Sequence, residues 1–141
     1  MIVYVLDTDV VSHLMRGRLP ELAMSRLAGL SRDAVRTTSI TLGELYFGAL
    51  RSAHAKRWLE AVEAMRGRLT CLSFDPLAAE HYGDLRAHLE AKGRRIDDAD
   101  LRIAAICRST GSTLVSGNAR HFERVPGLCY ENWLAPRAAR D

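Results

Sequence analysis

The sequence has 141 residues, of which 48% are apolar and 26% are charged. This composition excludes a largely disordered chain, and the length is enough to bury a core of two or three layers, so we expect a single domain over residues 1–141. The formal net charge of +3 and a pI near 9.0 are compatible with a polyanionic partner but do not identify one.

The first predicted elements are a strand and two helices. Residues 1–6 are a continuous apolar run that stops at Asp7, as a buried parallel strand does. Either Thr8 or Asp9 can cap a short helix that continues to about residue 16. Gly17 and Pro20 then separate it from a helix over residues 21–30.

The middle of the chain repeats this alternation. Residues 35–39 predict a short strand, and the apolar spacing over residues 40–50 predicts a helix that carries Glu44 near its start. An amphipathic helix over residues 54–66 and a strand over 69–72 follow. The pair Asp75-Pro76 then opens a helix that ends at Gly93.

The last predicted elements are a helix over residues 97–107, a strand over 112–116 leading to Gly117 and Asn118, and an edge strand over 128–130. Strands that alternate with helices of crossover length favour a parallel sheet with helices on both faces. We therefore predict a three-layer α/β/α fold with a central parallel sheet of four to five strands.

Other classes of protein and site are disfavoured. The three cysteines are odd in number and widely spaced, which fits neither a disulfide framework nor a zinc site. No apolar run could span a bilayer, and residues 1–6 lack the features of a signal peptide, so we expect a cytoplasmic protein without membrane contact. Metal-ligand spacing is absent among the histidines, to which we assign no metal: His13, His54, His81, His88 and His121.

Three acidic residues interrupt otherwise apolar elements: Asp7 after the first strand, and Glu44 and Asp100 inside helices. An isolated carboxylate is costly to bury. Because the carboxyl ends of parallel strands meet at one edge of a sheet, Asp7 should lie near the turn that holds Ser116 and Asn118. Clustered carboxylates repel one another unless a cation joins them, and hard oxygen ligands suit Mg²⁺ or Mn²⁺.

Such an ion, or a pair of ions, activates water for in-line attack on a phosphodiester and neutralises charge on the leaving oxygen. The pattern therefore predicts nuclease chemistry without a side-chain nucleophile. Each acid alone also has a structural interpretation. Asp7 could cap the following helix, Glu44 could pair with Arg51 or Lys56, and Asp100 could be a first-turn residue favoured by the helix dipole.

Four blocks of the sequence resemble the motifs of PIN domains, particularly the VapC and FitB group. The opening Val-Leu-Asp-Thr-Asp of residues 5–9 has Asp9 where that group usually has Asn. The other three blocks cover residues 38–48, 97–105 and 113–127, and the closing Asn-Trp pair of the group is present at residues 132–133. The match covers nearly the whole chain in the right order, and the four blocks together are highly specific.

The resemblance implies a metal-dependent endoribonuclease, the toxin of a VapBC-type toxin-antitoxin module, that cleaves RNA with Mg²⁺ or Mn²⁺. By motif position Asp7, Glu44 and Asp100 are the catalytic and metal-binding acids. The fourth position, often Asp in the family, is Asn118, which can bind through its carbonyl oxygen or position a water. Thr8 and Ser116 are supporting residues.

The resemblance also implies a homodimer and a heteromeric complex with a VapB-type antitoxin that blocks the acidic groove. The large apolar residues over 42–50 could supply surface for these contacts, although such spacing is equally typical of core.

Neighbouring acids at the third motif should have different roles. At 100° per residue, Asp97 and Asp100 share one side of the helix and Asp98 points elsewhere. Asp100 should ligate the metal. Asp97 should either cap the helix or hold a metal-bound water, with capping favoured, and Asp98 should be a solvated charge.

Two rival functions remain. A dinucleotide-binding module would need a G-x-G-x-x-G turn after the first strand, where Asp7-Thr8-Asp9 stands instead. A catalytically weak or inactive PIN-type module that binds RNA or protein would explain Asn118, but an inactive relative would usually lose several acids, and three remain.

Overall fold

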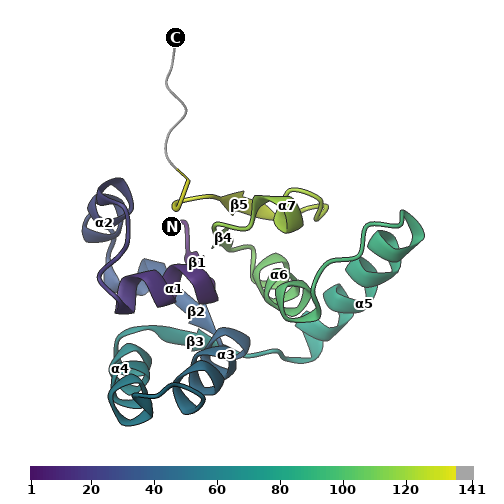
Figure 1. The fold of residues 1–141 in the computed structure, drawn as a ribbon. Coiled ribbons are helices and arrows are strands. Elements are labelled where there is room, and N and C mark those ends of the chain that lie inside the picture. The colour runs from purple at the N-terminus through teal and green to yellow at the C-terminus, as the bar shows by residue number, and fades with distance from the viewer. Residues whose placement is uncertain (136–141) are drawn as a thin grey trace.

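The computed structural model describes residues 1–135 and shows a parallel sheet covered by helices (Figure 1). The strands are β1 (Tyr4–Leu6), β2 (Val35–Thr38), β3 (Thr70–Leu72), β4 (Thr113–Val115) and β5 (Cys129–Glu131). All four pairings are parallel, in the order β3-β2-β1-β4-β5. This confirms the predicted α/β class and the upper limit of the predicted strand number. The predicted domain end at residue 141 lies outside the described residues, so the single-domain extent stays a prediction.

The helices follow the strands in chain order. They are α1 (Thr8–Met15), α2 (Glu21–Ala28), α3 (Ser39–Leu50), α4 (Ala55–Arg68), α5 (Pro76–Ala91), α6 (Asp98–Thr110) and α7 (Ala119–Phe122), with a 3₁₀ turn at Arg32–Ala34. The sequence did not predict α7, because a single helical turn is too short for its periodicity to be recognised. Within residues 1–135, none of the helices has the length and apolarity that a membrane crossing requires.

Side chains of the central strands alternate between two apolar cores. In β1, Tyr4 and Leu6 enter one core while Val5 enters the other, as the two-residue repeat of a strand requires. The first core lies against α1 to α4, and the second against α5, α6 and α7. Figure 1 shows α2 and α4 on one side and α5 and α6 on the other. Both faces of the sheet are thus covered, which explains why all three residues of β1 and two of the three residues of β4, Leu114 and Val115, are apolar and buried.

Helix α6 is buried in its central turns. Ile103, Ala104, Ala105, Ile106 and Cys107 are fully buried. The helix ends at Gly111, whose φ of 65° is a left-handed conformation that favours glycine. This packing fixes the position of α6. Its first turn, which carries Asp98 and Asp100, therefore lies beside the carboxyl ends of β1 and β4.

Candidate active site

Asp7 follows the last residue of β1 and is almost completely buried, with 3% of its surface exposed. Its backbone N–H donates to the carbonyl of Val115 at 3.1 Å, and its Oδ1 accepts from the N–H of Val10 at 3.1 Å. The prediction that Thr8 or Asp9 caps α1 was therefore wrong. Asp7 caps it, because its extended backbone at the strand end places the carboxylate over the first helical turn.

The pKa of Asp7 is raised from 3.8 to about 7, mainly by burial, and the carboxylates of Asp9 and Asp100 contribute to this rise. Hydrogen bonds from Ser116 and from the Val10 N–H oppose this rise. The predicted proximity of Asp7 and the Ser116 turn is thus present. An ionised Asp7 would place uncompensated negative charge in a dry environment beside other acids, which is the condition that a bound cation relieves.

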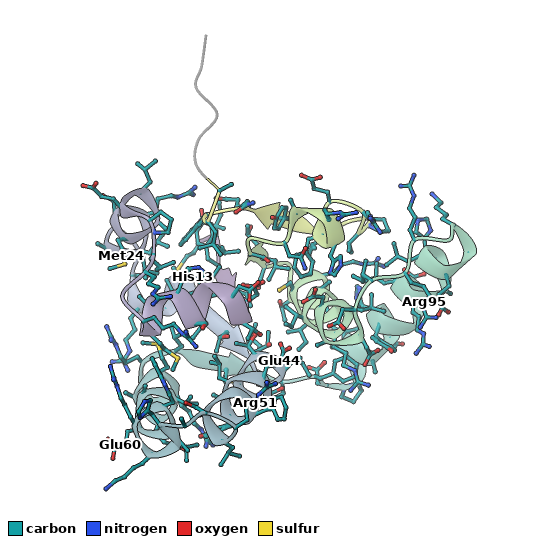
Figure 2. The ribbon with its side chains drawn as sticks, viewed as in Figure 1. His13, Met24, Glu44, Arg51, Glu60 and Arg95 are labelled. Carbon is teal, nitrogen blue, oxygen red and sulfur yellow. The ribbon has the colours of Figure 1, made fainter. Side chains whose placement is uncertain are left out.

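Glu44 reaches the same edge from α3. The hydroxyl of Thr8 donates to Glu44 Oε1 at 2.5 Å and lies 3.3 Å from the hydroxyl of Thr41. In the described part of the chain, no ion pair joins Glu44 to Arg51 or Lys56, the alternative that the sequence left open. Figure 2 shows Glu44 on the side of α3 that faces the ends of α1 and α6, where side-chain oxygens gather. Thr8 follows Asp7 directly in the chain and donates to Glu44, so it fixes the position of Glu44 relative to Asp7.

Asp100 lies in the first turn of α6 with about a fifth of its side chain exposed (19%). Its Oδ2 is 2.7 Å from Nδ1 of His121 and accepts from the side-chain amide of Asn118 at 3.1 Å. Burial raises the pKa of Asp100, with Asp97 and Asp9 adding to the rise, while the contact with His121 opposes it.

Ser116 is fully buried and shapes the turn that carries Asn118. The Ser116 hydroxyl accepts from the backbone N–H of Asn118 at 2.9 Å. Between them, a Cβ on Gly117 would lie 2.8 Å from Cδ1 of Leu134, so glycine allows this close packing.

Sequence reasoning did not select His121. No ligand spacing marks it, and only α7 turns its ring toward Asp100. Its position three residues after Asn118, one helical turn along the chain, is the signal that could have identified it.

The two other acids of the third motif have roles that differ from those expected. Asp97 occupies the N-cap position of α6, but its side chain forms no capping hydrogen bond, so the favoured capping role was wrong. Its φ and ψ of −53° and 140° place the residue outside the helix without directing the carboxylate to the helical N–H groups. Asp98 is not a free solvated charge, because it accepts hydrogen bonds from Tyr82 and, at 2.8 Å, from Arg102.

These neighbours together lower the pKa of Asp98. Asp98 therefore belongs to an ion-paired surface between α5 and α6, whereas Asp97 influences Asp100 through charge.

The donor set fits a hard divalent cation. Asp7, Glu44 and Asp100 offer carboxylate oxygens, and the side-chain amide of Asn118 adds a carbonyl oxygen. No group of three histidine, cysteine or acidic side chains within residues 1–135 is arranged to enclose one ion. Mg²⁺ does not need such a cage, because it is usually held by one or two carboxylates and keeps several waters. The raised pKa of Asp7 supports the same conclusion, because an ionised Asp7 is unfavourable in this buried place beside other acids unless a positive charge compensates it.

One family model, the PIN domain, matches residues 4–128 of the chain. The chain belongs to the PIN-domain family. This confirms the resemblance that the four sequence blocks indicated. Asp7, Glu44, Asp100 and Asn118 all lie inside the matched region of this PIN domain.

Curated relatives of this PIN domain carry VapC names. It is 39% identical to "Ribonuclease VapC2" of Haemophilus influenzae over 136 residues, covering 95% of this chain and all of the relative. It is 35% identical to "tRNA(fMet)-specific endonuclease VapC" of Shigella flexneri, covering 94% and 99%. The similarity therefore extends over nearly the whole length of both proteins.

Solved structures that resemble this PIN domain also belong to VapBC proteins. The DNA-bound VapBC of Salmonella typhimurium contains a chain that superposes with a TM-score of 0.86 at 36% identity, covering 94% of this PIN domain and 99% of that chain. VapBC2 of Rickettsia felis, bound to a DNA fragment from its promoter, also gives a TM-score of 0.86, at 30% identity and with 94% and 99% coverage. The predicted fold and the VapC-like group are confirmed together.

Proposed function

We propose that this PIN domain is the endoribonuclease toxin of a VapBC-type toxin-antitoxin module. The observation that carries the proposal is a buried Asp7 with a raised pKa at the carboxyl end of β1, close enough to Asp100 for their charges to interact. Glu44 is linked to the same place through Thr8, the residue that follows Asp7. The names of the relatives, ribonuclease and tRNA(fMet)-specific endonuclease, support RNA as the substrate. Hydrolysis of a phosphodiester is the chemistry to which such acids are suited.

The proposed cofactor is Mg²⁺ or Mn²⁺, held by Asp7, Glu44 and Asp100. When bound, the ion would supply an activated water and neutralise charge on the leaving oxygen. The protein's own part is to fix the acids in advance. Val10 and Ser116 orient Asp7.

The other acids are fixed in the same way. Thr8 holds Glu44, and Asn118 donates to Asp100. Because Val10, Ser116 and Thr8 already occupy their positions in the folded chain, Asp7 and Glu44 need little reorganisation when substrate binds.

The proposed partners follow from the complexes that the similar structures contain. VapBC structures of Salmonella typhimurium and Rickettsia felis pair a toxin with its antitoxin, and we extend this to a VapB-type antitoxin for the present chain, with a homodimer and a cytoplasmic location. Helix α3 is a candidate contact surface, because Phe47 and Leu50 are each 64% exposed. Leu45 of the same helix is buried in the core and is unavailable for this purpose.

The test is cleavage of single-stranded RNA and of tRNA(fMet) by the purified chain freed from antitoxin. We expect cleavage with Mg²⁺ or Mn²⁺, none in excess EDTA, and recovery when the metal is restored. Asp100→Asn should be inactive and Asp98→Asn, two residues away in the same helix, should be active. Undiminished cleavage in excess chelator would refute the metal mechanism. A wild-type protein that binds RNA and antitoxin but never cleaves would favour the alternative of an inactive binding module.

A further inference from the structure

Three side-chain atoms beside the acidic edge form a nearly equilateral triangle. Asp100 Oδ2 lies 2.7 Å from His121 Nδ1 and 3.1 Å from the side-chain amide nitrogen of Asn118, which itself lies 2.9 Å from His121 Nδ1. The three residues come from two segments, the first turn of α6, which holds Asp100, and α7 with its N-cap, which hold His121 and Asn118.

Hydrogen bonding does not satisfy all three sides of this triangle while Asp100 is ionised. If Nδ1 of His121 carries a proton, it and the Asn118 amide both donate to Asp100 Oδ2, and the 2.9 Å side of the triangle sets two donor nitrogens against each other. If Nδ1 carries none, it accepts from Asn118 but directs its lone pair at a carboxylate oxygen 2.7 Å away. Heavy-atom positions do not distinguish the oxygen of the Asn118 amide from its nitrogen. If the amide is flipped, its oxygen faces the Asp100 oxygen, and two acceptors then repel each other.

A divalent cation resolves this conflict, because it takes lone pairs from all three groups at once. Adjacent ligands of an octahedral ion with bonds of about 2.1 Å lie about 3 Å apart. The sides of the triangle, 2.7 to 3.1 Å, match this spacing. Asn118 would then bind through its carbonyl oxygen.

His121 is held in place by its neighbour in α7. Phe122 is 1% exposed and packs in the second core, which anchors this single helical turn. The His121 side chain keeps 31% of its surface exposed, so an ion can reach it from solvent. The imidazole is therefore positioned by the fold rather than by the contact with Asp100 alone.

We propose that His121, together with Asp100 and Asn118, ligates the divalent ion of this centre, and that its imidazole shifts the preference of the site from Mg²⁺ toward Mn²⁺. Imidazole nitrogen suits transition metals, whereas Mg²⁺ prefers a shell made only of oxygen. The inference rests on the proposed metal-dependent function and adds a nitrogen ligand to it. It revises the expectation from sequence that no histidine binds metal.

The test is metal binding to the full-length chain after dialysis against EDTA. Electron paramagnetic resonance of free Mn²⁺ gives the Mn²⁺ affinity, competition gives the Mg²⁺ affinity, and pulsed measurements detect ¹⁴N coupling from a bound imidazole. The variants are His121→Ala and His121→Gln, with His88→Ala in the last turn of α5 as the matched control. Asp7→Asn reports on the acidic centre independently, and circular dichroism verifies that each variant is folded.

The wild type and His88→Ala should bind Mn²⁺ with ¹⁴N coupling. Both His121 variants should lose the coupling and bind Mn²⁺ at least about tenfold more weakly, with a smaller change for Mg²⁺. Unchanged coupling and an unchanged Mn²⁺/Mg²⁺ ratio in both folded variants would overturn the inference. If Asp7→Asn lost Mn²⁺ binding in that same experiment, the acidic metal centre would stand without His121. A wild-type chain that binds neither ion would overturn both proposals.

Discussion

Replacing Asp7 by asparagine should stabilise the metal-free protein at neutral and alkaline pH while removing its activity. The folded protein raises the pKa of Asp7 from 3.8 to about 7, mainly by burial, so folding favours the protonated carboxyl. A carboxyl with a raised folded-state pKa contributes its full stability below pH 3.8 and loses it as the pH rises through 7. Asparagine has nearly the same shape and can still accept from Val10, but it has no charge to bury.

The size of the effect follows from the two pKa values. At 1.36 kcal/mol for each pKa unit, the difference between 3.8 and about 7 gives an upper value of about 4 kcal/mol at pH 8. We expect an observed gain of about 2 to 4 kcal/mol, or roughly 6 to 12 °C in melting temperature for a domain of this size. Near pH 4.5 the gain should shrink to about 1 kcal/mol, because the folded wild type is then protonated at Asp7.

The assay is denaturant unfolding of both proteins in EDTA at pH 4.5 and pH 8, followed by thermal melts with added Mg²⁺ or Mn²⁺. The ion should raise the melting temperature of the wild type and leave Asp7→Asn nearly unchanged, because only the wild type has the complete site. Asp98→Asn is the control for loss of an exposed aspartate. A difference between wild type and Asp7→Asn that is the same at both pH values, or a variant that is less stable at pH 8, would refute the reasoning.

Other predictions concern the residues around this centre. Asp100→Asn should abolish metal-dependent cleavage without lowering the melting temperature in EDTA, since the raised pKa of Asp100 shows that its charge does not favour folding. Asp98→Asn should cleave normally but melt slightly lower at neutral pH, a difference that vanishes on acidification below pH 3.8, because the folded-state pKa of Asp98 is lowered. An inactive Asp98→Asn with an active Asp100→Asn would mean that the third motif is assigned to the wrong register. Thr8→Val should leave unfolding unchanged but slow cleavage by about tenfold or more by releasing Glu44, and wild-type rates would contradict this role. Asp97→Ala should change the free energy of unfolding by less than about 0.5 kcal/mol, against about 1 kcal/mol for loss of a hydrogen-bonding cap, as denaturant titration can distinguish.

The sheet was predictable because short strand-like segments rich in apolar and β-branched residues alternate with helical segments along the chain. Asp7 and the Ser116 turn end two of these segments, and the rule that parallel strands present their carboxyl ends at one edge predicts from sequence that these residues lie together. The predicted boundaries were less accurate. Ser39 belongs to α3 rather than to β2, because the Thr38 side chain accepts from Thr41 and starts the helix one residue earlier than expected.

The sequence by itself determined the parallel α/β fold and the PIN family, and it supplied Asp7, Glu44 and Asp100 as the proposed site, because these depend on periodicity and on motifs that are continuous along the chain. Only the tertiary structure decided which hydrogen-bond partner each acid has. The donation from Thr8 to Glu44 and the approach of His121 to Asp100 join residues 36 and 21 positions apart, which no local pattern specifies. The directions of the Asp97 and Asp98 carboxylates were likewise set by the packing of α5 against α6, since helix geometry fixes where a side chain starts but not which neighbour it meets.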